Sequence, residues 1–283
     1  METVIIKDTG EIIDNVCRIY TQEQLETINR KNKKSLVRSK DNFIFITYKL
    51  LSSLNIENDN FTQPDIARIV YIMSYLSNDN RLMLTERTPM TKEKLSELMG
   101  LNKKVFNTFF NKLIKNNILI EKENYLFINK EFSFYGSIKG NKYDIIRIYK
   151  KNVRLLYNNM SSKEHKRLAI LYLLIPFINI KYNIVCSNPL EEDENEVQPL
   201  TIEQLAEYFD YDLKRFISLI DFLFNLKDKD ENPVIKTINN TKNKKDNSII
   251  INPRVIYAGN DFKDVECLCV LFNKIESDKK NKK

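Results

Sequence analysis

Apolar residues recur at helical spacing along much of the chain. They return every three or four positions in residues 64–77 and 162–177, which we expect to form two buried helices. Shorter segments with the same period predict helices at 92–99, 102–116, 202–209 and 212–226. Thr91 and Thr201 are expected N-caps, and Gly100 is expected at a C-cap. Short apolar runs predict strands at 81–85, 118–121, 125–129, 180–186, 234–238 and 248–251. The pattern therefore predicts a mainly α fold with small β wings, in the α+β class.

The chain repeats both these elements and several residue patterns. Residues 90–97 read MTKEKLSE and residues 200–207 read LTIEQLAE, so Thr, Glu, Leu and Glu recur at the same spacing. Further similar pairs, in the same order along the chain, are 45–49 with 146–150, 66–76 with 167–177, 106–113 with 216–223, and 127–136 with 250–259. Five such pairs indicate two copies of one module in tandem.

Each copy has the order helix, strand, helix, turn, helix, strand, wing, strand. This order is that of a winged helix-turn-helix. We therefore predict two tandem winged helix-turn-helix modules, at residues 41–140 and 141–262. The preceding segment, 1–40, is expected to hold a β-hairpin over residues 4–14, a short helix and a basic arm. The last segment, 263–283, ends in a basic tail.

Residues suited to catalysis or metal binding are scarce. The five glycines form no phosphate-binding loop motif. The single histidine, His165, lies at the polar start of an expected helix, so we expect it on the solvated surface. The acidic run 191–196 fits no calcium loop and is expected to be solvated. No zinc-binding spacing is formed by the cysteines, which are Cys17, Cys186, Cys267 and Cys269. We therefore expect a protein that is not an enzyme and that needs no cofactor or metal.

Composition and charge fit a globular protein. Of 283 residues, 42% are hydrophobic and 29% are charged, and 45 basic against 38 acidic residues give a net charge of +7. No stretch approaches the roughly 18 uninterrupted apolar residues of a membrane span. The N-terminus lacks the basic region and cleavage site of a signal peptide. We expect a cytoplasmic protein with reduced cysteines and without a membrane partner.

The helix expected at 102–116 has one apolar face and one basic face. Its apolar stripe consists of Val105, Phe106, Phe109, Phe110 and Leu113. The other face has no acidic residue and carries Lys103, Lys104, Asn107, Thr108, Asn111 and Lys115. Such a helix fits the major groove of duplex DNA, where Asn pairs with adenine and Lys reaches guanine or phosphate. We expect DNA contact by this face, and the alternative is an ordinary solvated face in a chain rich in Lys and Asn.

The second copy offers a helix and a wing as DNA-binding candidates. The helix presents Lys214, Arg215 and Ser218 outward, together with the acidic Asp221. The hairpin tip that follows it carries Lys242, Lys244 and Lys245, which we expect to lie along phosphates or in a minor groove. The first copy differs, because its short wing is acidic.

The N-terminal segment offers a further basic candidate. Residues 30–40 contain six basic residues and no acid, and the candidate phosphate contacts there are Lys31, Lys33, Lys34 and Arg38. The alternative interpretation of this segment is a solvated linker.

The tandem segments resemble a known family. Residues 146–149, 168–177, 200–207 and 250–254 resemble tandem winged-helix replication initiator proteins of plasmids and phages of low-GC Gram-positive bacteria. The resemblance covers roughly residues 40–260, and single winged helices of MarR-like transcription regulators are a weaker match. It implies binding to repeated or palindromic duplex sites, with no chemistry by the protein itself. The acidic first wing departs from this pattern.

Three functions follow as hypotheses. The first is a sequence-specific double-stranded DNA-binding protein that initiates phage or plasmid replication at origin sites. The second is a transcription regulator of a phage or mobile element, and the third is a protein-interaction module built from winged helices. Host replication or transcription proteins are candidate partners. The chain is expected to be a monomer or a homodimer, and the apolar stretch 265–272 fits either a closing helix or a dimer contact.

Overall fold

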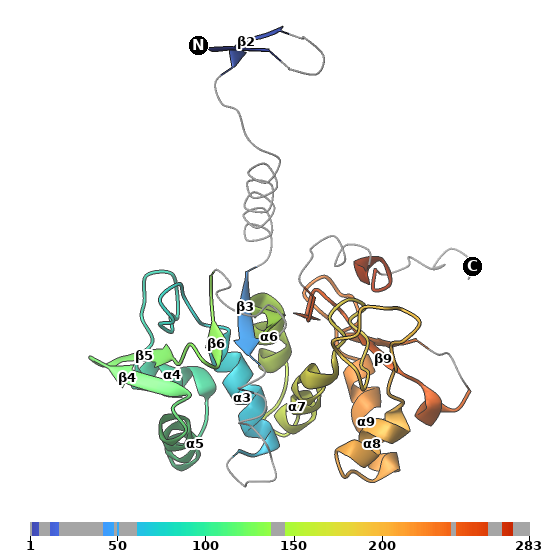
Figure 1. Cartoon of the computed structure of the whole chain (residues 1–283). Helices are drawn as coiled ribbons and strands as arrows, with labels where there is room; N and C mark the ends of the chain where they lie inside the picture. The colour runs from blue at the N-terminus through green and yellow to red at the C-terminus, as the bar shows by residue number, and fades with distance from the viewer. Residues whose placement is uncertain are drawn as a thin grey trace, which may run out of the picture. The chain divides into compact units, whose positions relative to one another are not determined.

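The computed structural model in Figure 1 describes residues 2–5, 12–16, 42–47, 50, 61–136, 145–238, 242–259 and 268–273. The chain divides into two compact units, Met1–Asp41 and Asn42–Lys283. In the first unit, strand β1 (Glu2–Ile5) pairs antiparallel with β2 (Ile12–Val16), which confirms the expected hairpin. Its turn, the short helix, the basic arm and the tail lie outside the described residues.

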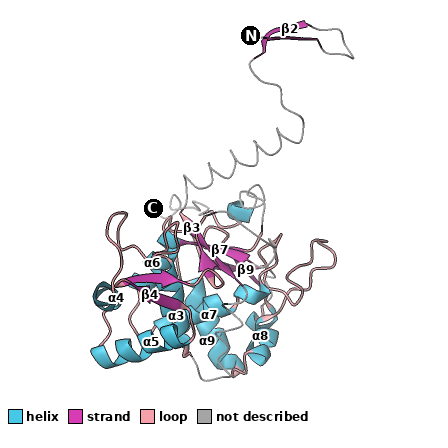
Figure 2. Cartoon of the chain, turned by 60° about the vertical axis from the view of Figure 1, so that its left-hand side comes forward, coloured by secondary structure: helices cyan, strands magenta, loops and turns pink. Residues whose placement is uncertain are grey.

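The second unit is a mixed α+β fold. Its first half contains β3 (Phe43–Thr47), α3 (Gln63–Met73), α4 (Lys92–Met99), α5 (Lys103–Lys115), β4 (Leu119–Lys122), β5 (Tyr125–Ile128) and β6 (Ser133–Phe134). Its second half contains β7 (Ile145–Tyr149), α6 (Lys150–Asn158), α7 (His165–Leu173), the 3-10 turn η3 (Ile175–Phe177), α8 (Ile202–Tyr208), α9 (Leu213–Phe224), β8 (Ile235–Thr237), η4 (Lys244–Asp246), β9 (Ile249–Ile251) and β10 (Ile256–Tyr257). The six helices expected from the periodicity are all present, with slightly shorter bounds (Figure 2).

Two of the expected strands do not form regular strands. Residues 81–85 and 180–186 make only isolated bridges, such as Leu82 with Leu76 and Val185 with Ile178. The reason is that each segment lies between a helix end and a hairpin and bonds to them through single bridges, not through a continuous ladder of backbone hydrogen bonds. The other four expected strands are present as two antiparallel pairs, β4 with β5 and β8 with β9.

The two halves meet in one four-stranded sheet with the order β10-β7-β3-β6. The two inner strands, β3 and β7, pair antiparallel, with Ile44 opposite Ile148 and Ile46 opposite Ile146. Each inner strand also pairs with the short outer strand of its own half, β3 with β6 and β7 with β10. The pairing is thus symmetric about the β3–β7 pair, which is the pattern that a local two-fold axis between the two halves would produce.

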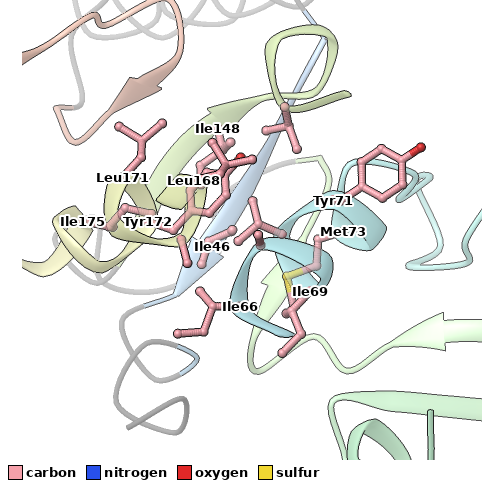
Figure 3. Close-up of a cluster of buried hydrophobic side chains, with 14 of the residues drawn as sticks. Ile46, Ile66, Ile69, Tyr71, Met73, Ile148, Leu168, Leu171, Tyr172 and Ile175 are labelled. Atoms are coloured by element: carbon pink, nitrogen blue, oxygen red, sulfur yellow. The ribbon is translucent and has the colours of Figure 1, made fainter. Parts of the chain in front are cut away.

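Helices α3 and α7 pack against each other and against this sheet. Figure 3 shows their side chains gathered with Ile46 of β3 and Ile148 of β7 in one cluster. Ile66 and Tyr71 of α3 and Tyr172 of α7 are among the largest fully buried side chains. Burial of such side chains stabilises a fold by about 1.5–3 kcal/mol each. The residues predicted as two modules, 41–140 and 141–262, thus share one hydrophobic core.

Matching hydrogen bonds recur in the two halves. Asn80 and Asn183 are both buried in the left-handed backbone region, with φ of 62° and 57°. The amide of Asn80 donates to carbonyl oxygens in β5 and β6 at 3.0 and 2.7 Å. The amide of Asn183 donates to carbonyl oxygens in β9 and β10, both at 2.8 Å. Asparagine suits this position because it tolerates positive φ and its amide supplies two donors.

The helix caps also match. Thr91 and Thr201 accept hydrogen bonds from backbone N–H groups of the following helix, as the sequence predicts. Asn102 and Asp212 cap α5 and α9 in the same way. Gly100 ends α4 with a φ of 58°, which confirms the expected glycine C-cap. The turn before each of the helices α5 and α9 is therefore tightly specified.

Candidate nucleic-acid interface

Helix α5 is held to the body by an aromatic face. Phe106, Phe109, Phe110 and Leu113 are buried, as the stripe predicts. Val105 is not part of this face, because it is 39% exposed. It lies one residue before Phe106, which places it about 100° around the helix from that side chain.

A buried carboxylate fixes where α5 docks. Asp65 of α3 accepts from Arg68 at 2.8 Å and from Lys112 of α5 at 3.4 Å. Its other hydrogen bonds come from Thr62, whose backbone N–H and hydroxyl form the cap of α3. Lys112 thus forms an ion pair with α3 and is not part of the outward face of α5.

The outward face of α5 is basic and exposed. Lys103, Lys104, Thr108, Asn111 and Lys115 are exposed, and Asn107 is half-buried. None of the three lysines forms an ion pair with a residue in the part of the chain that the structure describes. The Thr108 hydroxyl donates to the carbonyl of Lys104 at 3.0 Å, so its oxygen remains an acceptor toward solvent. The face thus presents uncompensated positive charge and amide groups.

Helix α9 presents a smaller face of the same kind. Lys214, Arg215 and Ser218 are exposed, and the Arg215 guanidinium lies 5.5 Å from the centre of the Tyr211 ring. Tyr211 accepts a short hydrogen bond from Gln63 of α3, which ties the turn before α9 to the first half. Asp221 follows on the same side of the helix.

The hairpin of the second half folds back onto its own helices. Lys244 forms an ion pair with Asp221 of α9, and Lys245 forms one with Glu203 of α8, each at 2.9 Å. The hydrogen bond with Glu203 raises the pKa of Lys245. Among the three lysines expected to meet phosphates, only Lys242 is exposed without a carboxylate partner in the described residues.

The hairpin of the first half is short and acidic, as the sequence indicates. Glu123 and Asn124 form its tight turn with φ of 50° and 64°. Arg81 lies against it, 5.3 Å from the ring centres of both Tyr125 and Phe127. The candidate phosphate contacts Lys31, Lys33, Lys34 and Arg38 lie outside the described residues.

The prediction for His165 is wrong. Its side chain is not on the surface, since the residue is only 5% exposed and its ring stacks 3.8 Å from that of Tyr157. Its Nε2 lies 3.1 Å from the Tyr157 carbonyl, and burial lowers the pKa of the imidazole. The polar residues next to His165 in the sequence predicted a surface position, but α6 and α3 pack over its side chain. Sequence periodicity alone carries no signal for that contact.

Two cations that the sequence did not single out fasten the halves together. Lys150 and Arg154 of α6 donate to carbonyl oxygens of Leu76 and Ser74, just beyond the C-terminal end of α3. Cations are favourable at this end of a helix. Burial lowers the pKa of Lys150 to about 8. These contacts are structural and lie apart from the basic faces.

Within the described residues there is no group of three His, Cys, Asp or Glu side chains that could hold a metal ion. Cys186 is a buried thiol, Cys269 is buried as well, and burial raises the pKa of Cys186. Cys17 and Cys267 lie outside the described residues. No helix in the described part of the chain combines the length and apolar character that a bilayer crossing requires.

No protein-family model, no curated protein and no solved structure significantly matches this chain.

Proposed function

We propose that each half of the second unit is a winged helix-turn-helix and that the chain binds double-stranded DNA sequence-specifically. Helices α4 and α5, and likewise α8 and α9, are joined by a capped tight turn and followed by a hairpin, which is the arrangement of this motif. The observation that carries the proposal is the outward face of α5. It has three exposed lysines and the exposed amide of Asn111, no acid, and no ion pair with another described residue.

Helices α5 and α9 support a two-part interface. They lie on opposite flanks of the α3–α7 pair in Figure 1, and both lie toward the lower side of the second unit in Figures 1 and 2. An α-helix in each of two successive major grooves is how dimeric helix-turn-helix proteins bind. One chain with both helices would supply the two contacts as a monomer, and a homodimer is the alternative.

Replication initiation is the role that we propose, in the cytoplasm and without catalysis by the chain itself. Its support is the resemblance of residues 40–260 to tandem initiators. Transcription regulation of a phage or mobile element is the second candidate, because the same faces would serve at a promoter. A protein-interaction role is the third, and fold alone does not rank them.

Selection of bound sequences from random duplex DNA, followed by a salt titration, tests the proposal. A two-part motif with a steep fall of affinity with salt is the expected result, because neutralised phosphates release counterions. If no sequence is enriched and duplex binding shows no salt dependence, the DNA-binding proposal is wrong and the protein-interaction role is favoured. The enriched motif also separates the roles, since it can be searched for at origins and at promoters.

A further inference from the structure

The outward faces of α5 and α9 can be aligned at three positions. Their N-caps, Asn102 and Asp212, are equivalent, and each is followed four residues later by a buried Phe. The same offset aligns three outward positions, which are Lys104 with Lys214, Thr108 with Ser218, and Asn111 with Asp221. The two helices therefore present comparable stripes to whatever they bind.

The third aligned position changes the chemistry. Asn111 has an amide that both donates and accepts, which suits the N6 and N7 edge of adenine. Asp221 has a carboxylate that only accepts, which suits the amino group of cytosine. The first two pairs keep their chemistry, lysine with lysine and hydroxyl with hydroxyl. Among these three aligned positions, only the third therefore changes its chemistry.

Lys244 makes the carboxylate compatible with a polyanion. Its Nζ lies 2.9 Å from both oxygens of Asp221, and the two side chains remain 64% and 43% exposed. The pair neutralises the acid on an otherwise basic face and leaves lone pairs of the carboxylate open to solvent. It also connects the β8–β9 hairpin to α9. Neither feature exists in the first half, where Asn111 has no charge to balance.

The sheet gives the symmetry of the target. The pairing of β3 with β7, and of each with its own outer strand, is symmetric about the β3–β7 pair, which is the pattern that a local two-fold between the halves would produce. Two-fold related recognition helices bind inverted half-sites, because the symmetry of the site mirrors that of the protein.

We propose that Asp221, balanced by Lys244, is a specificity residue that makes the second half-site differ from the first. The target is then an imperfect inverted repeat. Its two half-sites have the same bases where the aligned lysines and hydroxyls bind. They differ at one base pair, which Asn111 contacts in the first half-site and Asp221 contacts in the second. This inference rests on the proposed DNA binding.

The test compares motifs selected from random duplex DNA by the full chain and by three variants. Asp221→Asn should make the two half-sites alike at the position that this residue contacts and raise the preference for matching bases there by about tenfold, which is the scale of one good base contact. Asn111→Asp should convert the first half-site toward the second. Asp230→Asn is the matched control, because it removes another exposed Asp–Lys pair, Asp230 with Lys229 at 2.7 Å.

The outcomes separate the two proposals. Reciprocal motif changes in the first two variants, with none in the control, support the inference. If Asp221→Asn and Asn111→Asp both select the wild-type motif, the inference is overturned while the proposed DNA binding stands. A wild-type motif made of direct repeats overturns the inference in the same way. No enrichment by the wild-type chain overturns the proposed function itself. Circular dichroism spectra identical to that of the wild type show that the variants are folded.

Discussion

Polar side chains buried at the joint between the halves are the most constrained single residues. The ring of Tyr157 lies between those of Tyr71 and His165, with centroid distances of 3.9 and 3.8 Å. Burial raises the pKa of Tyr157 to about 12 and lowers the pKa of His165. A neutral imidazole is therefore part of the packing, and its protonation would place a charge in a site that is built to exclude water.

The pH dependence of stability follows from this. Because the pKa of His165 is lower in the folded chain than its ordinary value near 6.5, the unfolded chain takes up the proton first as pH falls. The free energy of unfolding should then drop below about pH 6.5 and be fully retained above it. We expect urea unfolding at pH 7.5 and 5.5 to show a smaller difference for His165→Gln than for the wild type. Carboxylates contribute equally to both proteins, so identical differences would contradict the assignment.

At the scale of elements, α5 depends on its aromatic face. Phe109→Ala should lower the free energy of unfolding by about 3–5 kcal/mol, because the side chain is only 2% exposed and its removal leaves a cavity. Val105→Ala on the same helix is the control, and an exposed position of this kind should change stability by less than about 0.5 kcal/mol. Guanidinium denaturation measures both. Equal losses in the two variants would mean that α5 packs differently.

The opposite face of α5 should govern sequence recognition. We expect Lys104→Ala combined with Asn111→Ala to weaken binding to the selected site by about 1–3 kcal/mol per lost base contact, and to relax its sequence preference. Lys130→Ala with Lys151→Ala is the control, since both lysines are exposed and lie outside α5 and α9. Competition binding against unrelated duplex measures the effect, and losses of equal size in both pairs would point to a general charge effect instead.

The second hairpin allows its lysines to be told apart. Lys242→Ala should weaken all duplexes alike and reduce the salt slope by about one unit, the value for one phosphate contact. Lys245→Ala should leave the slope unchanged, because Lys245 is paired with Glu203 at 2.9 Å. Binding titrations at several salt concentrations measure both slopes. A larger change for Lys245 would mean that its ion pair opens on DNA.

Sequence reasoning reached the elements whose signals are local. The amphipathic period and the caps at Thr91, Thr201 and Gly100 were sufficient to predict the helices. The helix α6 was missed. The sequence repeat pairs Phe45 with Ile146. In the structure, Phe45 lies opposite Phe134, and Arg147 lies opposite Tyr257, the residue that the repeat pairs with Phe134. The equivalent of Phe45 in the second half is therefore Arg147, one residue later than the sequence repeat indicates. Strand pairing is decided by partners about a hundred residues away, and no local pattern encodes it.

The candidate site was predictable in part for the same reason. Exposure of the α5 face follows from its own period, so the residues Lys103 to Lys115 were placed correctly on one helix. The partners of Lys244 and Lys245 lie on other helices, and the chain gives no sign of them before it folds. The buried Asn80 and Asn183 were also missed, because their value lies in hydrogen bonds to strands that come much later in the chain.

At the scale of the whole molecule, the shared core decides how the second unit unfolds. Leu168 of α7 is fully buried in the cluster that also contains α3 and the β3–β7 pair. Leu168→Ala should cost about 2–5 kcal/mol and lower the stability of both halves together. Amide hydrogen exchange in mild denaturant measures this, since cooperative units open as one.

Protection of α5 and of α9 should fall by the same factor in this variant, although neither helix contains residue 168. Leu126→Ala, in the first hairpin, is the comparison, because Leu126 is equally buried but lies on the flank of one half. If Leu168→Ala weakens α9 and leaves α5 protected, the halves are independent domains that only touch. If both weaken together, the local two-fold is maintained by one core, and the spacing of the two DNA-facing helices is fixed by the same residues that fold the chain.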